Sequence, residues 1–380
     1  FSVSPAGYGT DVCWRCSEAL SCLEIGDSGV LMLCWKTVAA LSSMFADRAP
    51  SSHNSKPWGI PVCREVEGGA CCEIIFSIEC SRALVANKHV AREVFISLGC
   101  YIALFDRAMK TFGCSRLSLE YLEERSIDSC SDLLLVERRL KGSLLMCVAK
   151  YSVDSEGRGE DVHDSLLKGL LRKTYRGDFR EEQDVSVGED RGRFWSYNSD
   201  SDCARIRVMD HESFEIWLSL YGEYGFRDYS DPAVWRETHS WIHGSPSAAQ
   251  RVIGLRSGDV LGPLLSVDGI LNRVLLHPRF SPQSVREARA RRLASSGLRG
   301  LRDAKGILVA WCDTDSCVFD LVELGEQIFD LWVCAEEAGY AVWPISVLTQ
   351  YEDTRARLQS CLGLKEGPVF CAPFGVPAHS

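Results

Sequence analysis

The sequence predicts an α+β protein built of two halves, each with one long buried helix and a few short strands. Apolar residues recur at helical spacing over 92–112 and again over 319–338. A short apolar run that is typical of a buried strand accompanies each helix, at 72–78 and at 307–312. A charged, Gly-containing stretch at 154–161 lies between the two sets and is predicted to be a linker.

The linker divides the chain into parts. Residues 1–29 are predicted to form an N-terminal extension, because the first regular helical pattern begins after them. Residues 30–153 form the first half and residues 162–380 the second. The halves do not align closely as sequences, so they are similar in plan rather than repeats.

The first half begins with a predicted helix over 30–45, where apolar residues follow the helical period. The segment 48–58 then contains two prolines and cannot be helical throughout. Besides the strand at 72–78, further strands are predicted at 118–122 and 144–151, and the segment between these two is predicted to be a polar link.

The second half begins with an apolar helical run at 166–171, which leads into the basic cluster 172–176. A polar loop is predicted over 184–202. Helices are predicted over 208–220 and 232–242, ahead of the strand and the long helix named above.

Composition excludes some classes of protein. The chain has 380 residues, 46% hydrophobic and 25% charged, which is normal for a folded domain. The net charge of −10 argues against a general nucleic-acid binder. No apolar run approaches the roughly 20 residues of a membrane span.

The 18 cysteines are scattered, many in apolar runs, which favours buried thiols in a reducing compartment, either the cytoplasm or an organellar matrix or stroma. No set of four ligands at matched spacing is found, so no metal site is predicted.

The segment from Arg286 to Lys305 is rich in arginine. One interpretation is a solvated helix and loop, which is what most basic clusters are. The other is a docking face for an acidic protein partner. The sequence leaves both open.

Two clusters carry possible binding chemistry. Arg172, Lys173, Thr174 and Arg176 offer three cations and a hydroxyl within five residues, which suits a phosphate group. The segment from Ser51 to Trp58 offers hydroxyl, imidazole, amide and amine groups and then an aromatic ring. Such a set suits the polar edge and the face of a flavin ring. Taken alone, each is more often an ordinary polar surface.

Together the clusters resemble the nitroreductase superfamily, and most closely its two-lobed Acg-like subgroup. The matching segments, in chain order, are Arg48-Ala49-Pro50-Ser51-Ser52-His53-Asn54-Ser55-Lys56-Pro57-Trp58, Cys80-Ser81-Arg82-Ala83-Leu84, Ala91-Arg92-Glu93, Ser97-Leu98-Gly99-Cys100, Arg172-Lys173-Thr174-Tyr175-Arg176-Gly177-Asp178-Phe179, Leu324-Gly325-Glu326-Gln327, Gly339-Tyr340-Ala341 and Pro344-Ile345-Ser346. The first resembles Pro-Ser-x-x-Asn-x-Gln-Pro-Trp, which lines the FMN site in this superfamily. The order of the matches makes the resemblance specific.

This resemblance implies a nitroreductase-like fold of two fused lobes, a pseudo-dimer in one chain that holds FMN between the lobes. It implies that Arg172, Thr174 and Arg176 hold the FMN phosphate. Ser51 and Asn54 would face the ring and ribityl chain, together with Lys56 and the aromatic Trp58. Family enzymes pass a hydride from NADH or NADPH through the flavin to a small acceptor, such as a quinone or a nitroaromatic compound. No separate catalytic acid or base is indicated.

Several positions depart from the family pattern. Lys56 stands where the family has Gln, Cys80 replaces an acidic residue and Ala91 replaces Gly. The usual Arg-x-Gly near the C-terminus is absent. Two alternatives to an FMN-dependent enzyme therefore remain open. One is a flavin-sequestering protein, and the other is a cofactor-free scaffold subunit of a larger complex.

Overall fold

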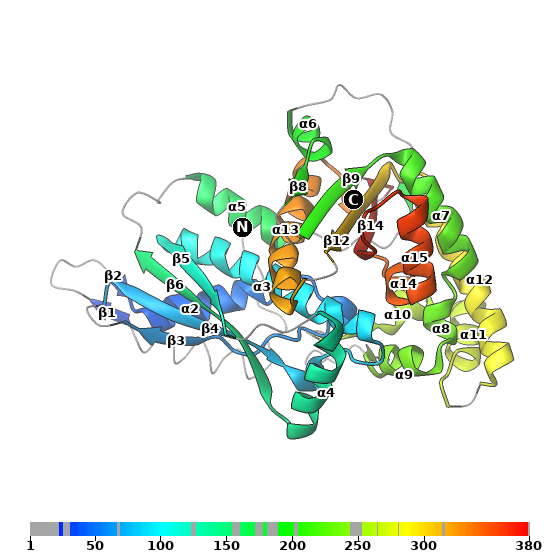
Figure 1. The fold of residues 1–380 in the computed structure, drawn as a ribbon, viewed down its shortest axis with the longest axis horizontal. Coiled ribbons are helices and arrows are strands. Elements are labelled where there is room, and N and C mark those ends of the chain that lie inside the picture. The colour runs from blue at the N-terminus through cyan, green and yellow to red at the C-terminus, as the bar shows by residue number, and fades with distance from the viewer. Residues whose placement is uncertain are drawn as a thin grey trace.

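The computed structural model shows an α+β protein with two main antiparallel sheets and two long helices, α3 and α13, between them (Figure 1). The N-terminal half of the chain builds the sheet on the left of that view, and the C-terminal half builds the sheet on the right. The structure describes residues 23–25, 31–66, 69–122, 127–153, 160–171, 178–180, 189–200, 204–243, 253–263, 265–279, 281–313 and 316–378.

The first sheet has the order β3-β4-β6-β5, and each neighbouring pair is antiparallel. Its strands are β3 (Val62–Glu65), β4 (Cys71–Glu79), β5 (Cys114–Tyr121) and β6 (Ser143–Val153). The three strands predicted in this half are therefore confirmed. Alternate residues of β4 point toward helix α3 (Lys88–Thr111), where the ring of Phe76 meets that of Phe105 edge-on at 5.2 Å.

The predicted polar link between β5 and β6 is wrong over much of its length. It contains η3 (Ile127–Ser129) and helix α4 (Cys130–Leu140). Cys130 and Leu134, four residues apart, are fully buried and form the face that packs on α3. Only one narrow face is apolar, so the charged residues around it conceal the helical period. The helix ends at Lys141, whose φ of 56° is left-handed.

The second sheet has the order β13-β14-β12-β9-β8, with β7 also paired to β14, and its pairs are antiparallel. Its strands are β7 (Phe179–Arg180), β8 (Asn198–Asp200), β9 (Ala204–Met209), β12 (Gly306–Cys312), β13 (Ala341–Val342) and β14 (Pro368–Pro377). Strand β12 lies between β9 and β14 and every residue in it is buried. This confirms the strand predicted at 307–312, because a strand covered on both faces reads as a continuous apolar run.

Two predicted helices begin later than expected because a short strand precedes each one. The helix expected over 208–220 is α7 (His211–Tyr224), and its first predicted residues belong to β9. The change falls at Asp210, whose carboxylate accepts a hydrogen bond from the amide of Ser213 at 3.0 Å and caps the helix. The helix expected over 30–45 is α2 (Trp35–Ala46), preceded by β2 (Leu31–Leu33), which pairs with β1 (Leu23–Ile25).

The loop predicted over 184–202 is also incorrect, because the described part of it contains α6 (Glu189–Trp195) and β8. Phe194 is fully buried there and meets Phe374 edge-on at 4.9 Å. This tertiary contact holds a segment whose local composition is otherwise typical of a loop.

The two long helices cross at the centre of the molecule. They are α3 and α13 (Val318–Glu337), and both confirm the predicted long helices. At the crossing Gly99 faces Gly325, and a Cβ atom placed on Gly99 would lie 1.9 Å from the carbonyl oxygen of Val322. No side chain fits at such a distance, so the two backbones touch directly and join the halves of the chain.

The first of the remaining helices packs on α3 and α13, and the others pack around the second sheet or form a small unit beside it. They are α5 (Glu160–Leu171), α8 (Arg227–Ser230), α9 (Pro232–Ser240), α10 (Ser257–Leu261), α11 (Val267–Leu275), α12 (Gln283–Leu301), α14 (Val347–Gln350) and α15 (Glu352–Cys361), with the short pair β10 (Ile242–His243) and β11 (Leu255–Arg256). We call α8 to α12 the cap, since they share a small core of Trp235, Leu261, Leu276 and Ala290. Helix α9 confirms the helix predicted over 232–242. None of the described helices has the length and apolarity to cross a membrane.

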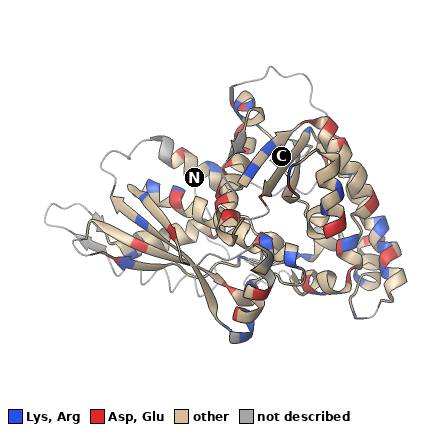
Figure 2. Ribbon diagram, viewed as in Figure 1, with Lys and Arg blue, Asp and Glu red and all other residues tan. Residues whose placement is uncertain are grey.

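The arginine-rich segment is helix α12 and the turn after it. Arg286 and Arg289 are buried, at 5% and 7% exposure, so the interpretation of this segment as a helix and loop exposed to solvent throughout is wrong. Arg289 donates to the side chain of Asn272 at 2.5 Å and to Asp268 at 2.8 Å, which fastens α12 to α11. Charged residues on α12 remain at the surface of the cap (Figure 2).

Candidate functional site

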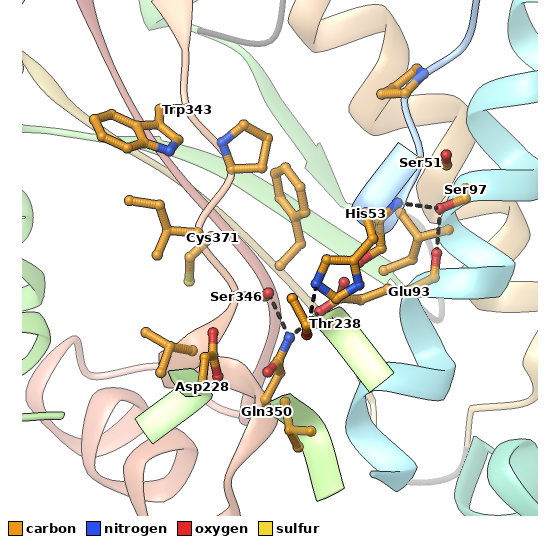
Figure 3. A pocket seen from close by; sticks show the side chains of 18 of the residues that line it. Ser51, His53, Glu93, Ser97, Asp228, Thr238, Trp343, Ser346, Gln350 and Cys371 are labelled. Atoms are coloured by element: carbon orange, nitrogen blue, oxygen red, sulfur yellow. Dashed lines mark hydrogen bonds between the residues drawn. The ribbon is translucent and has the colours of Figure 1, made fainter. Parts of the chain in front are cut away.

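A cavity of about 360 Å³ lies where the two halves of the chain meet (Figure 3). Residues 50–53 and the N-terminal part of α3 form one wall. The cap, residues 343–347 and strand β14 form the other. Ile328 and Trp332 of α13 close it from the central crossing. The cavity therefore combines the predicted polar turn with the Pro344-Ile345-Ser346 turn, which lies nearly three hundred residues further along the chain.

The polar turn has an unusual backbone. It contains η1 (Ser52–Asn54), and His53, Asn54 and Lys56 all have left-handed φ angles, of 52°, 50° and 47°. Non-glycine residues adopt this region at a cost of about 1–3 kcal/mol each, and such strain is concentrated at functional sites. The hydroxyl of Ser51 accepts the amide of Lys56 at 3.0 Å and closes the turn.

Contacts with α3 hold this turn against the cavity. The amide of Ser52 points to the hydroxyl of Ser97 at 3.4 Å, and that hydroxyl donates to the carbonyl of Glu93 at 2.6 Å. Ser51, Ser52 and His53 line the cavity as a result. Of the predicted site residues that the structure describes, Ser51 lies directly on the cavity wall.

Asn54 lies on the side of the turn that faces the cap. Its Nδ2 donates to the carbonyl of Gly254 at 3.1 Å, while the amide of Gly254 donates to the carbonyl of Asn54 at 2.9 Å. Gly254 immediately precedes β11 and has a φ of 92°. Asn54 therefore joins the two halves at the rim of the cavity and is not among the residues that line it.

Lys56 and Trp58 lie behind the turn. Burial lowers the pKa of Lys56, while the carboxylate of Asp47 opposes that shift. Trp58 is only 3% exposed, stacks on Tyr101 with ring centroids 4.7 Å apart, and donates from Nε1 to Asp47 at 2.9 Å. Neither residue lines the cavity, so the structure gives them a supporting position under the turn rather than the ring contact predicted from the sequence.

The predicted phosphate-binding residues Arg172, Thr174 and Arg176 lie outside the described residues. The described chain reaches Leu171, the last residue of α5, and resumes at residue 178.

Glu93 is the centre of a hydrogen-bond network in the cavity wall. Nε2 of Gln350 donates to its Oε1 at 3.0 Å and also contacts the hydroxyl of Ser346 at 2.7 Å (Figure 3). Burial raises the pKa of Glu93, and hydrogen bonds from Ser52, Gln350 and Ser346 partly oppose the rise. This carboxyl group therefore connects the polar turn, α3 and α14.

A second carboxyl group, Asp228 on α8, lines the cap side of the same cavity (Figure 3). Burial raises its pKa to about 8, and the neighbouring carboxylates of Glu93 and Asp231 add to the rise. The hydroxyl of Tyr351 acts in the opposite direction. The Oδ1 atom of Asp228 is buried and has no hydrogen-bond partner among the described residues.

Aromatic side chains supply part of the remaining wall. Trp332 comes from α13, Trp343 precedes the turn at Pro344, and Tyr229 and Trp235 come from the cap. Trp235 donates from Nε1 to the carbonyl of Leu276, which fixes the plane of its ring. Flat aromatic surfaces next to a few polar groups are the usual lining of a site for a planar ligand.

The cap is fastened to the first half at two further points. The carboxylate of Glu237 accepts the amides of Val85 and Ala86 at 3.0 Å. Thr238 Oγ1 and His53 Nε2 lie 3.2 Å apart, within hydrogen-bond distance. These contacts hold the cap against the first half beside the cavity.

Several of these residues have no signal in the sequence. Glu93, Ser97 and Cys100 belong to segments that resemble the superfamily, although the sequence assigns them no role. Asp228, Gln350 and the cap aromatics carry no motif, because their position depends on contacts between elements that are far apart in sequence. No cluster of three or more His, Cys, Asp or Glu residues able to hold a metal occurs in the described part of the chain.

Comparison with known proteins agrees with the fold and the motifs. No family model matches the chain. The chain is 24% identical over 332 residues to the probable NAD(P)H nitroreductase PigM of Serratia sp. (strain ATCC 39006), covering 86% of this chain and 85% of that protein. Together with the ordered motifs and the mixed α/β architecture, this similarity supports membership of the nitroreductase superfamily.

Proposed function

We propose that this protein is an FMN-dependent oxidoreductase that uses NADH or NADPH to reduce a small acceptor such as a quinone or a nitroaromatic compound. The observation that carries the proposal is the cavity, because the polar turn that resembles the FMN-lining segment of the superfamily meets there the turn that resembles the one behind the superfamily's closing helix. The relative that covers most of the chain is named as a probable NAD(P)H nitroreductase, which supports an oxidoreductase role.

The cavity fits a flavin ring in shape and chemistry. Its tryptophan walls suit the faces of a planar ring, and the strained turn at Ser51 and Ser52 brings hydroxyl and amide groups to one edge. When bound, FMN would accept a hydride from the nicotinamide and pass reducing equivalents to the acceptor. The protein's own residues would hold the ring, exclude water and position the acceptor.

We place the FMN phosphate at Arg172, Thr174 and Arg176, which follow directly after α5. Arginine side chains grip phosphate oxygens in pairs, and a threonine hydroxyl adds a further donor. In the same proposal Asn54 and Lys56 position the turn that faces the ring. Asn54 does so through its contact with the cap, and Lys56 does so through its buried position beneath the turn.

We further propose that residues 30–153 and 162–380 are two nitroreductase-like lobes fused in one chain, in the manner of the Acg-like subgroup, with residues 1–29 as an extension. Two features support this pseudo-dimer. Each part contributes one sheet and one long helix, and α3 and α13 cross at Gly99 and Gly325. The cavity takes residues from both parts.

The first test is the visible absorption spectrum of the purified protein, with mass identification of any chromophore that heat releases. A yellow protein that releases FMN and oxidises NADPH when a quinone is added supports the proposal. Arg176→Ala should lower the flavin content, with Arg180→Ala, an exposed arginine of β7, as the matched control. Equal flavin content in both variants would contradict the phosphate assignment, and a colourless protein that also fails to take up added FMN would contradict the whole proposal.

One set of contacts favours flavin sequestration as a second candidate. Glu237 holds two amides of the first half and lies 3.7 Å from Arg138, so the cap is fastened by charge-assisted hydrogen bonds. A cap that stays closed would keep acceptors out of the cavity. Glu237→Ala should then raise quinone reduction severalfold without changing the flavin content. If the wild-type protein already turns over and the variant gives no increase, sequestration is the wrong function.

A docking role at the segment from Arg286 to Lys305 is a further proposal. Arg291, Arg292, Arg299 and Arg302 are exposed there, whereas Arg286 and Arg289 are buried, so an acidic protein partner would meet the first four. If the chain were instead a scaffold without cofactor, this face would be its contact with the larger complex. A reducing cytoplasmic or organellar compartment suits these roles.

A further inference from the structure

Two oxygen atoms in the cavity wall have no hydrogen-bond donor among the described residues. They are Oδ1 of Asp228 on α8 and Oε1 of Gln350 on α14, and both are buried. Both side chains line the cavity (Figure 3). A buried acceptor without a partner destabilises a fold, so this position suggests that a ligand completes the hydrogen bonding.

Asp228 is surrounded by groups that disfavour its negative charge. Glu93 approaches it from α3 and Asp231 from the start of α9, and both repel a carboxylate. The hydroxyl of Tyr351, which precedes α15, opposes the rise in pKa, but it is itself buried without a hydrogen-bond partner among the described residues. Arg227, the neighbour of Asp228 on α8, does not offset this repulsion, because its guanidinium pairs with Asp353 at 2.7 Å. Burial and these neighbours raise the pKa of Asp228 to about 8, so the carboxyl group keeps its proton at neutral pH.

Glu93 is less suited to donate a proton, although it lines the same cavity. Its carboxyl group already has hydrogen-bond partners in Ser52, Gln350 and Ser346. These contacts fix it as a structural link between the turn and α14. Asp228 has the smaller set of partners and faces the cavity from the cap, the part of the wall that would cover an acceptor lying on a flavin.

We infer that Asp228 is a proton-donating residue of this cavity, which serves a quinone-type acceptor whose carbonyl oxygen lies against the carboxyl group. The inference rests on the proposed function and adds to it the source of the proton and the class of acceptor.

The reduction of a quinone balances in electrons and protons. Reduction to the hydroquinone takes one hydride and one proton. With the hydride supplied through the flavin from NAD(P)H, the O–H bond of Asp228 breaks and a new O–H bond forms on the quinone oxygen. Asp228 is left as a carboxylate, which water entering the cavity reprotonates after the product leaves. The hydroxyl of the hydroquinone is a donor, and it suits the unpaired oxygens of Gln350 and Asp228.

The test compares Asp228→Asn with the flavin-loaded wild-type protein, using a water-soluble benzoquinone and ferricyanide as alternative acceptors. Ferricyanide takes electrons without a proton. The asparagine variant should lose about 100-fold in kcat with the quinone, as removal of a general acid does, with little change in KM and an unchanged rate with ferricyanide. The wild-type quinone rate should decline above about pH 8, and this decline should be absent in the variant.

A readout that does not depend on turnover is the infrared carbonyl band of a protonated carboxylic acid. The wild-type protein should show such a band that titrates near pH 8, and Asp228→Asn should lack that titration. The matched control is Asp210→Asn, because Asp210 caps α7 through the amide of Ser213, does not line the cavity, and asparagine caps equally well. Asp228→Glu keeps the acid and should recover part of the quinone rate if the asparagine variant folds poorly.

The outcomes separate the two proposals. A yellow protein whose Asp228→Asn variant keeps the full quinone rate and the titrating band overturns the inference and leaves the oxidoreductase proposal standing. Equal losses with quinone and with ferricyanide also overturn it, because the residue would then act on the flavin or the fold. A wild-type protein that binds no flavin overturns the proposed function, and this inference with it.

Discussion

Replacing Gly325 by alanine should push the two central helices apart. A Cβ atom at this position would lie 2.2 Å from the carbonyl oxygen of Ile96, and real Cβ contacts begin at about 3.0 Å, so the oxygen must retreat by about 0.8 Å. The obstacle is backbone of the other helix and cannot rotate away. Overpacking of this kind costs about 1–3 kcal/mol or more. Alanine returns up to about 1 kcal/mol through its helix propensity. We expect a net loss of about 2 kcal/mol.

Urea unfolding measures this loss as a lower midpoint at an unchanged slope. Gly222→Ala is the matched control, since Gly222 is also helical but its added Cβ would meet only Leu298, at an ordinary 3.6 Å. The control should be as stable as the wild-type protein, or up to about 1 kcal/mol more stable. If both variants unfold at the wild-type midpoint, then α3 and α13 do not touch at Gly325, and the central crossing is not as described.

Two further substitutions test buried charges. Arg116→Met should destabilise the protein by about 3 kcal/mol in urea unfolding. Arg116 bridges Asp106 at 2.9 Å and Glu326 at 2.9 Å, so its loss leaves two half-buried carboxylates without their cation. Stability equal to that of the control Arg139→Met, on the surface of α4, would contradict this prediction. The pKa of Asp228 is about 8 in the fold and about 3.9 in an unfolded chain, so at this residue the folded state binds more protons, and its contribution to stability should fall from about pH 4 to pH 8. Asp228→Asn should remove part of that fall and raise the melting temperature at pH 8, and an identical pH dependence in both proteins would show that Asp228 titrates normally.

The elements that sequence could predict are those whose burial leaves a strong local pattern. Helices α3 and α13 are buried on wide faces over 24 and 20 residues, so their apolar period is unmistakable. Strand β12 is covered on both sides and reads as a continuous apolar run. In contrast, α4 is held by one narrow stripe, and α6 mainly by Phe194, so neither stands out from polar surroundings.

The residues of the candidate site also include some that the sequence could predict and some that it could not. The turn at Ser51 could be predicted because its run of polar groups, prolines and an aromatic ring resembles the FMN-lining segment of the superfamily. Asp228 could not, because its role comes from Glu93 and Tyr351, which lie more than 100 residues away on either side in sequence. A perturbed carboxyl group is a property of three-dimensional neighbours, and a single sequence does not contain that information.

The central crossing and the cavity are parts of the same structure. Cys100 follows Gly99 on α3 and lines the cavity, and its thiol lies 3.2 Å from the carbonyl of Gly325. On α13, Ile328 lies three residues beyond Gly325 and lines the cavity as well. Because the same stretches of helix form the contact between the halves and a wall of the cavity, the separation of the helices sets the width of the cavity. Neither half alone could therefore form the site, and a substitution at the crossing should alter ligand binding through the same displacement that lowers stability.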